Sequence, residues 1–275
     1  MKPIHFVNVR TGILKQAARA TTFSATIILI SCLTSTKASS VESLPESTGT
    51  CPANAALASL SALGSVYVGE IHGTNESPRL LECLVDYEVA AGIHPLTVSL
   101  ELQPFARDTK SLVWSGQDGR TSKAMAHVVD HLETLEKSGR IALNFQLPDR
   151  PVPEHVDEEI GDELHELAGK GRVIAYGGNF HAQRRQAMLP GVTTKPAGSY
   201  MGRTIKNVLI DATGPGEAWT CSQTSCGVQK TKSFVADGTL GTMIDGKKFG
   251  YDYVYFVQPY TSSAPKFPPV TRSGH

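Results

Sequence analysis

Residues 65–78 read SVYVGEIHGTNESP and contain the end of a strand and the start of a helix. The apolar, β-branched run up to Val68 predicts a buried strand, which Gly69 ends. Ser77 suits the N-cap of a helix and Pro78 suits its first turn, so we expect a helix to begin there. A strand that turns through a glycine-bearing loop into a helix is the repeating unit of an α/β fold.

The same alternation continues along the chain. Apolar runs predict further strands at residues 96–102, 141–147 and 172–176. Helical spacing predicts helices at residues 122–137 and 154–168, and the second is so acidic that we expect a solvated face. Strand-like segments without long helices between them follow at residues 208–210, 219–228 and 251–257. We therefore expect an α/β fold, with a mainly parallel sheet, helices on both faces and an antiparallel C-terminal extension.

The first forty residues are predicted to be a signal peptide, because a basic leader precedes an apolar run of about ten residues. Two processing sites compete. Residues 36–38 (TKA) suit an ordinary signal peptidase, whereas residues 29–32 (LISC) look like a lipobox, which would leave Cys32 as a lipid anchor. Residues 41–275 are then expected to form one domain that is periplasmic, anchored as a lipoprotein or secreted.

The balance of acidic and basic residues disfavours nucleic acid as a partner. The chain has 26 Lys and Arg and 26 Asp and Glu, so its formal net charge is zero. Proteins that bind nucleic acid or an anionic membrane surface usually carry a basic patch. We therefore expect a small-molecule or peptide substrate.

The cysteines predict two disulfides. Apart from Cys32, four cysteines remain, and an even number in an oxidising compartment favours pairing. Cys221 and Cys226 are five residues apart and suit the closing of a hairpin. Cys51 and Cys83 are left to pair, which would tie the mature N-terminus to the first long helix. A thiolate metal site is a weaker alternative, because no C-x-x-C spacing occurs.

Two Gly-x-x-His turns, residues 69–72 and 178–181, each follow a predicted strand directly. In an open α/β sheet, ligands bind beyond the carboxyl ends of the strands, so His72 and His181 are candidates for one site. Glu70 leaves the first strand two residues before His72, and Glu101 ends another apolar strand, where burial is costly without a partner. Two imidazoles with such carboxylates suit a divalent metal or acid/base catalysis.

Other candidate groups lie outside these turns. Arg184 and Arg185 follow His181, and either one could bind a substrate carboxylate. A rival site consists of His127, Asp130 and His131, whose histidines are one helical turn apart and could share a metal. A serine hydrolase and nucleotide cofactors are disfavoured, because the G-x-S-x-G, Walker A and strand-linked G-x-G-x-x-G patterns are missing from the sequence.

At these residues the chain resembles the superfamily of Tiki/TraB, erythromycin-esterase-like and ChaN-like haem-uptake proteins, as an exported bacterial member. The resemblance is carried by residues 69–78, Leu100-Glu101, residues 117–122 (QDGRTS) and residues 178–182 (GNFHA). It implies an α/β sandwich with a site at the carboxyl edge of the sheet. The residues that it transfers are Glu70, His72, Glu101 and His181, with Glu76 as a further candidate.

One segment departs from the pattern of this superfamily. After the strand at residues 141–145 the resemblance implies an aspartate and then a helix that contains Arg-Asp. Here Gln146 and the acidic residues 154–166 stand instead. The predicted site therefore includes no residue from this segment.

Three functions are compatible with these residues. The first is a hydrolase of peptide or ester bonds, in which His72, Glu101 and His181 hold a divalent ion and Glu70 or Glu76 activates water. The resemblance implies a metal-dependent protease for Tiki-like members and a His/Glu hydrolase for esterase-like members. The second is haem or iron binding of the ChaN type, through Tyr67, Tyr176 or a motif histidine. The third is a disulfide-stapled surface protein with a degenerate site.

Overall fold

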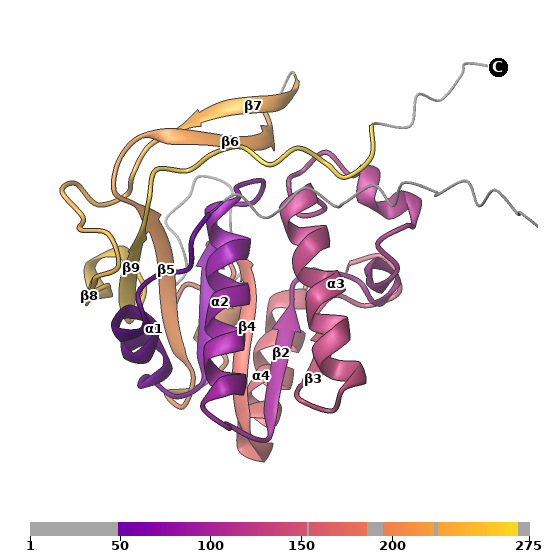
Figure 1. The fold of residues 1–275 in the computed structure, drawn as a ribbon. Coiled ribbons are helices and arrows are strands. Elements are labelled where there is room, and N and C mark those ends of the chain that lie inside the picture. Colours follow the sequence, from indigo (N-terminus) through magenta and orange to yellow (C-terminus); the bar gives the residue numbers. More distant parts are fainter. Residues whose placement is uncertain (1–48, 153, 186–194, 223–224, 269–275) are drawn as a thin grey trace, which may run out of the picture. The chain divides into compact units, whose positions relative to one another are not determined.

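The computed structural model describes residues 49–152, 154–185, 195–222 and 225–268 (Figure 1). The predicted signal peptide, with Cys32, lies outside the described residues. Within these ranges, no helix combines the length and the apolar character that a membrane span requires.

The described part of the chain is built around a seven-stranded sheet with the order β3-β2-β4-β1-β5-β9-β8. Its strands are β1 (Val66–Glu70), β2 (Leu96–Leu100), β3 (Ala142–Phe145), β4 (Arg172–Gly178), β5 (Lys206–Ala212), β8 (Met243–Asp245) and β9 (Tyr253–Val257). Every neighbouring pair is parallel except β8 with β9. The predicted α/β class with a mainly parallel sheet is confirmed.

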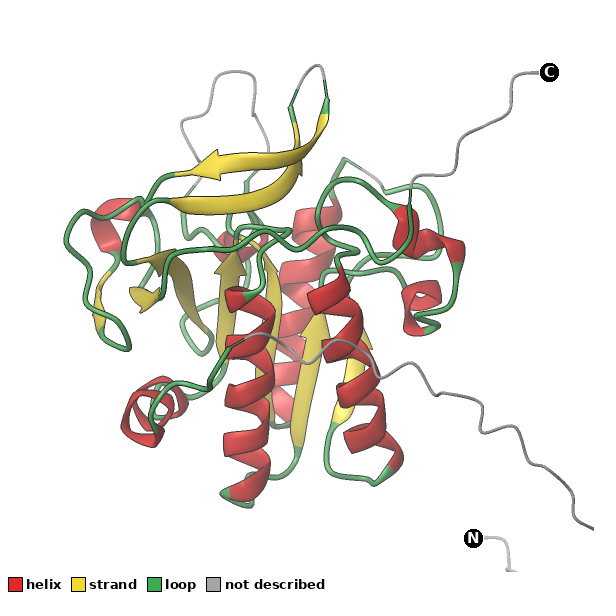
Figure 2. Ribbon diagram, turned by 45° about the horizontal axis from the view of Figure 1, so that its top comes forward, coloured by secondary structure: helices red, strands yellow, loops and turns green. Residues whose placement is uncertain are grey.

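Helices cover both faces of this sheet (Figures 1 and 2). They are α1 (Asn54–Ser61), α2 (Glu76–Ala90), α3 (Lys123–Lys137) and α4 (Val156–Lys170), with short 3₁₀ turns η1 (Pro104–Arg107), η2 (Leu112–Ser115), η3 (Ala197–Ser199) and η4 (Lys247–Phe249). Val66 and Val68 of β1 pack with α1, α2 and α3, while Tyr67 between them packs with α4 on the other face. Burial on both faces explains why the strand sequences are almost continuously apolar.

The starts of the helices agree in part with expectation. The hydroxyl of Ser122 caps α3 by accepting a hydrogen bond from the backbone N–H of Met125, 3.2 Å away. Helix α2 starts earlier than predicted, because Asn75 occupies the N-cap position and Ser77 is buried within the first turn. The early start brings Glu76 into the helix, where its acidic side chain suits the N-terminal end of the helix dipole.

The C-terminal third contains the predicted antiparallel extension, but two of its predicted strand segments join the parallel sheet instead. Strands β5 and β9, which contain residues 208–210 and most of 251–257, run parallel to the main sheet and extend it. Among the described strands, the antiparallel pairs are β8 with β9 and the hairpin of β6 (Gly216–Cys221) and β7 (Cys226–Thr231). This hairpin lies above the carboxyl ends of the strands (Figure 1).

Both predicted disulfides are present. Cys51 is bonded to Cys83 of α2 with a Cα–Cα distance of 5.7 Å, and Cys221 is bonded to Cys226 across the end of the β6–β7 hairpin. The first links the segment before α1 to the helix that starts beside the carboxyl edge of the sheet. Disulfides of this kind persist in oxidising compartments, which agrees with a location outside the cytoplasm.

Candidate functional site

Three neighbouring strands bring the predicted residues to one edge of the sheet. β4 lies between β2 and β1, and all three run in the same direction, so their carboxyl ends lie side by side. Glu101 follows β2 directly, Glu70 ends β1, and His181 lies three residues beyond β4. The structure therefore brings together Glu70, His72, Glu101 and His181, as predicted.

The first imidazole is held by the carboxylate of its own turn. His72 Nδ1 is 2.8 Å from Glu70 Oε1, and the other oxygen of Glu70 accepts a hydrogen bond of 2.5 Å from the hydroxyl of Tyr176. Glu70 is only 5% exposed, so it has little freedom to turn away. A carboxylate on Nδ1 fixes the ring orientation and leaves Nε2 to react, as in a catalytic Asp–His pair.

The second imidazole is held in the same way by a residue that the sequence did not identify. His181 Nδ1 is 2.6 Å from Asp157 Oδ1, which also accepts a hydrogen bond of 2.9 Å from the backbone N–H of Ala197. Asp157 is buried in the first turn of α4, so the expected solvated face is wrong at this position. The acidic segment therefore does contribute to the site. Gln146, which precedes this segment, accepts a hydrogen bond from the hydroxyl of Tyr67.

Glu101 lies between the two imidazoles. Its Oε1 is 3.4 Å from His181 Nε2, and its Oε2 is 4.0 Å from His72 Nε2. Oε2 also accepts a hydrogen bond of 2.5 Å from the backbone N–H of Gly178. A Cβ on Gly178 would lie 2.9 Å from His72 Nε2, so only glycine lets the backbone of β4 approach both groups. The glycine of the second Gly-x-x-His turn thus makes room for the histidine of the first.

Arg120 is the cation of the site. Its Nε lies 3.2 Å from Glu101 Oε1 and 3.3 Å from His72 Nε2. The residue belongs to the QDGRTS segment that carries part of the resemblance, yet it was not among the predicted site residues. Its loop turns at Gly119, where φ is +90° and an added Cβ would meet the backbone oxygen of Trp219 in the hairpin. The position of Arg120 therefore depends on packing between distant segments.

The surroundings shift the pKa values of the three central groups. Burial lowers the pKa of His72, but the hydrogen bond and charge of Glu70 outweigh it, so the pKa lies above the usual 6.5. Burial also lowers the pKa of His181, but the charge of Glu101 and the hydrogen bond to Asp157 outweigh burial. The pKa of His181 therefore also lies above 6.5. Burial raises the pKa of Glu101, but the two histidines and Arg120 bring it below 4.5.

Two adjoining cavities open at these residues. The inner one is about 10 Å³ and is bordered by Glu70, His72, Glu101 and Arg120, which is on the order of the space for one water molecule. The outer one is about 420 Å³, has mainly apolar walls and reaches Glu101 and Arg120 at one end. The pair of cavities suits a water molecule beside the imidazole and a substrate in the larger space.

Three predicted residues lie elsewhere. Glu76 accepts hydrogen bonds from the backbone and hydroxyl of Thr261, at 2.9 and 2.6 Å, and so holds the C-terminal segment against α2. Arg184 pairs with Asp252 at 2.7 Å and donates to backbone carbonyls around it. Arg185 donates to the backbone oxygen of Lys247. The structure thus does not bring Glu76, Arg184 or Arg185 to the imidazoles.

The three residues of the rival site, His127, Asp130 and His131, do not converge on one point either. Asp130 accepts a hydrogen bond of 2.7 Å from Thr109. His127 and His131 each lie against a carboxylate of α2 instead: His127 is 3.6 Å from Glu82, and His131 is 2.7 Å from Asp86.

A divalent ion does not fit His72, Glu101 and His181 as they are arranged here. The guanidinium of Arg120 lies against both Glu101 and His72, on the side where a cation would need their lone pairs. In the described part of the chain, the trio whose ligand atoms all lie within 4.8 Å of one another is Glu82, Asp86 and His131. The predicted ligand role of the three site residues stays a prediction.

Haem iron does not fit the two tyrosines. Tyr67 and Tyr176 are buried, and their hydroxyls are hydrogen-bonded to Gln146 and Glu70. Burial raises the pKa of both phenols well above the usual 10, which opposes the phenolate that iron prefers.

Comparisons with known proteins place the fold. No protein-family model matches the chain, and no curated protein matches it. Among solved structures, a Bacillus cereus structural-genomics protein has a TM-score of 0.51 at 11% identity, over 80% of this chain and 95% of that one. This likeness shows a shared α/β fold.

Two further solved structures match less well. A succinoglycan biosynthesis protein has a TM-score of 0.46 at 9% identity, over 76% of this chain and 92% of that one. An erythromycin esterase mutant in its open conformation has a TM-score of 0.44 at 10% identity, over 74% of this chain and 93% of that one.

Proposed function

We propose that the protein is a hydrolase of ester or peptide bonds in which two carboxylate-held histidines act directly as base and acid. The observation that carries the proposal is the pair Glu70–His72 and Asp157–His181, whose Nε2 atoms both face Glu101. Burying two such pairs at one sheet edge is costly for a protein that uses neither. Acid/base catalysis by positioned imidazoles contributes about 10²–10⁴-fold to a rate.

The geometry favours distinct roles for the two histidines. His72 borders the small inner cavity, so its Nε2 is suited to take a proton from a water molecule there. His181 is then suited to protonate the leaving group, and Arg120 to stabilise the negative charge that develops on the carbonyl oxygen. Glu101 aligns Arg120 with both imidazoles.

The metal-dependent version and the haem-binding version of the site are the alternatives to this proposal. The position of Arg120 favours direct catalysis over a metal ion, and the engaged tyrosines disfavour haem. We also propose export, with a small-molecule or peptide substrate, to the periplasm, to the membrane as a Cys32-anchored lipoprotein or to the medium. Two disulfides support that location.

Chelation is expected to leave the activity unchanged. The assay uses purified protein with chromogenic p-nitrophenyl esters and quenched fluorescent peptides, before and after dialysis against EDTA. Direct acid/base catalysis needs no ion, so kcat/KM should stay within about 2-fold, because the barrier is then unaltered. Loss of turnover on chelation, restored by zinc, would instead favour the metal-dependent version of the site.

The pH profile of kcat/KM is expected to have its acidic limb above pH 6.5. A base must be neutral, and the raised pKa of His72 keeps it protonated at a pH where a free histidine has lost its proton. Glu70→Gln removes the charge that raises this pKa, so the limb should move to lower pH. The matched variant Glu159→Gln, on the exposed face of α4, should leave the limb in place. An unmoved limb in Glu70→Gln would remove His72 as the base.

A further inference from the structure

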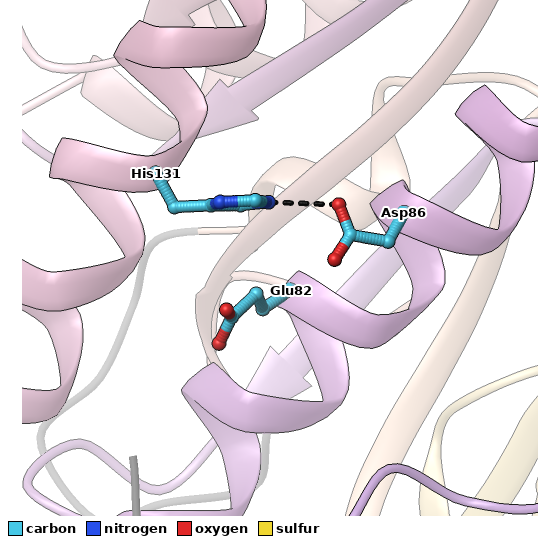
Figure 3. Close-up of side chains that lie close together, drawn as sticks. All are labelled: Glu82, Asp86 and His131. Carbon is cyan, nitrogen blue, oxygen red and sulfur yellow. Dashed lines mark hydrogen bonds and ion pairs between the residues drawn. The ribbon is translucent and has the colours of Figure 1, made fainter. Parts of the chain in front are cut away.

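A second cluster of metal-ligating groups lies between α2 and α3, away from the imidazole pair at the sheet edge. Glu82 and Asp86 are four residues apart on α2, and His127 and His131 are four residues apart on α3. Residues at this spacing share one face of a helix. The two faces meet in matching levels: Asp86 lies against His131 (Figure 3), and Glu82 lies against His127.

Three of these groups converge closely. His131 Nε2 is 2.7 Å from Asp86 Oδ1, and one ligand atom each of Glu82, Asp86 and His131 lies within 4.8 Å of the other two. In a tetrahedral zinc site with bonds of about 2.0–2.1 Å, ligand atoms are about 3.3 Å apart. Small side-chain rotations therefore bring the three atoms to ligand spacing. Figure 3 shows Asp86 directed at the imidazole of His131 across the space between the helices, with the carboxylate of Glu82 extending from α2 towards α3.

The burial and charge of the cluster favour a cation. Glu82 is only 6% exposed, and its Oε2 faces Arg79 at 2.8 Å, which leaves Oε1 directed towards α3. The two carboxylates of Glu82 and Asp86 outnumber the single guanidinium of Arg79 beside them. Asp86 is 48% exposed, so Glu82 supplies the carboxylate that is removed from water, and a buried carboxylate attracts a divalent ion more strongly than an exposed one does.

We propose that Glu82, Asp86 and His131 bind a divalent transition-metal ion of the zinc class between α2 and α3. Imidazole and carboxylate donors suit zinc, nickel or copper rather than calcium, which prefers six or more oxygens. Three protein ligands leave a fourth position for water, and His127 lies against Glu82, where it orients that carboxylate. The ion would cross-link α2 and α3, two of the helices that cover one face of the sheet.

The test measures zinc binding by tag-free protein in equilibrium dialysis with ZnCl₂, with elemental analysis of the protein. Wild type should bind one equivalent at this site. His131→Ala and Asp86→Asn should each weaken that binding by at least about 10-fold, since even an outer-shell change costs about 10–100-fold. His155→Ala is the matched control, because His155 also pairs with a carboxylate four residues away, at 2.9 Å, but belongs to no trio of candidate ligands among the described residues.

The outcomes separate this site from the candidate active site. Zinc should raise the Tm of wild type and of His72→Ala but not that of His131→Ala, whose Tm without zinc shows that it is folded. Wild-type zinc affinity in both His131→Ala and Asp86→Asn would overturn the proposal, as would the absence of binding to wild type. If zinc binding were lost in His72→Ala but kept in His131→Ala, the metal would belong to the candidate active site. That result would overturn both this proposal and the proposal of direct acid/base catalysis.

Discussion

Replacement of His72 by alanine is expected to lower kcat/KM by about 10²–10⁴-fold, the range for loss of a positioned acid or base. His72 borders the water-sized cavity, and Glu70 holds the ring by Nδ1 so that Nε2 can accept a proton. Alanine removes the acceptor and leaves Glu70 with its hydrogen bond from Tyr176. The measurement is steady-state hydrolysis of the best p-nitrophenyl ester or peptide from the panel.

The control for this variant is His155→Ala. His155 is 63% exposed and pairs with Glu159 at 2.9 Å, so it too is a carboxylate-paired imidazole, but on the surface of α4. Its loss should change kcat/KM by less than about 2-fold. A similarly small change in His72→Ala, with the same Tm as wild type, would refute the proposed role of His72.

Replacement of Arg172 by alanine is expected to cost about 3–5 kcal/mol of unfolding free energy, the usual result of leaving a buried charge without its partner. Glu88 is fully buried in α2, and Arg172 Nε donates to its Oε2 at 3.0 Å while Nη2 donates to its Oε1. Arg172 also donates to the backbone oxygen of Ser61 at the end of α1. The pair thus joins the start of β4 to two helices.

Thermal unfolding measures this effect. At roughly 2–4 °C per kcal/mol for chains of this size, the Tm of Arg172→Ala should fall by about 10 °C. Arg150→Ala removes an exposed pair with Glu159, which is worth about 0–1 kcal/mol, and serves as the control. The double variant Arg172→Ala with Glu88→Gln should recover part of the loss, because the unpaired charge is gone. Equal Tm changes in Arg172→Ala and Arg150→Ala would contradict the buried-pair interpretation.

The sequence predicted the strand ends of the site because their signal is local. Each Gly-x-x-His turn follows an apolar run, and Glu101 ends another, so the carboxyl edge of a parallel sheet collects all three. Asp157 was missed because an acidic helix start looks the same whether it faces solvent or a histidine. Its position after a predicted strand, in the first turn of the next helix, was the signal that could have found it. Arg120 was missed although its segment was noticed, since a loop carries no periodicity.

By itself, the sequence determined the α/β class, both disulfides and four residues of the candidate site, because strand periodicity, cysteine count and residues next to strand ends are properties of neighbours in the chain. Only the tertiary structure decided the parallel direction of β5 and β9, the place of Arg120 beside Glu101, and the pairing of Asp157 with His181. These depend on how segments that are distant in the chain pack against one another. The separation of His127 and His131 from Asp130, and their approach to Glu82 and Asp86, likewise follows from the contact between α2 and α3.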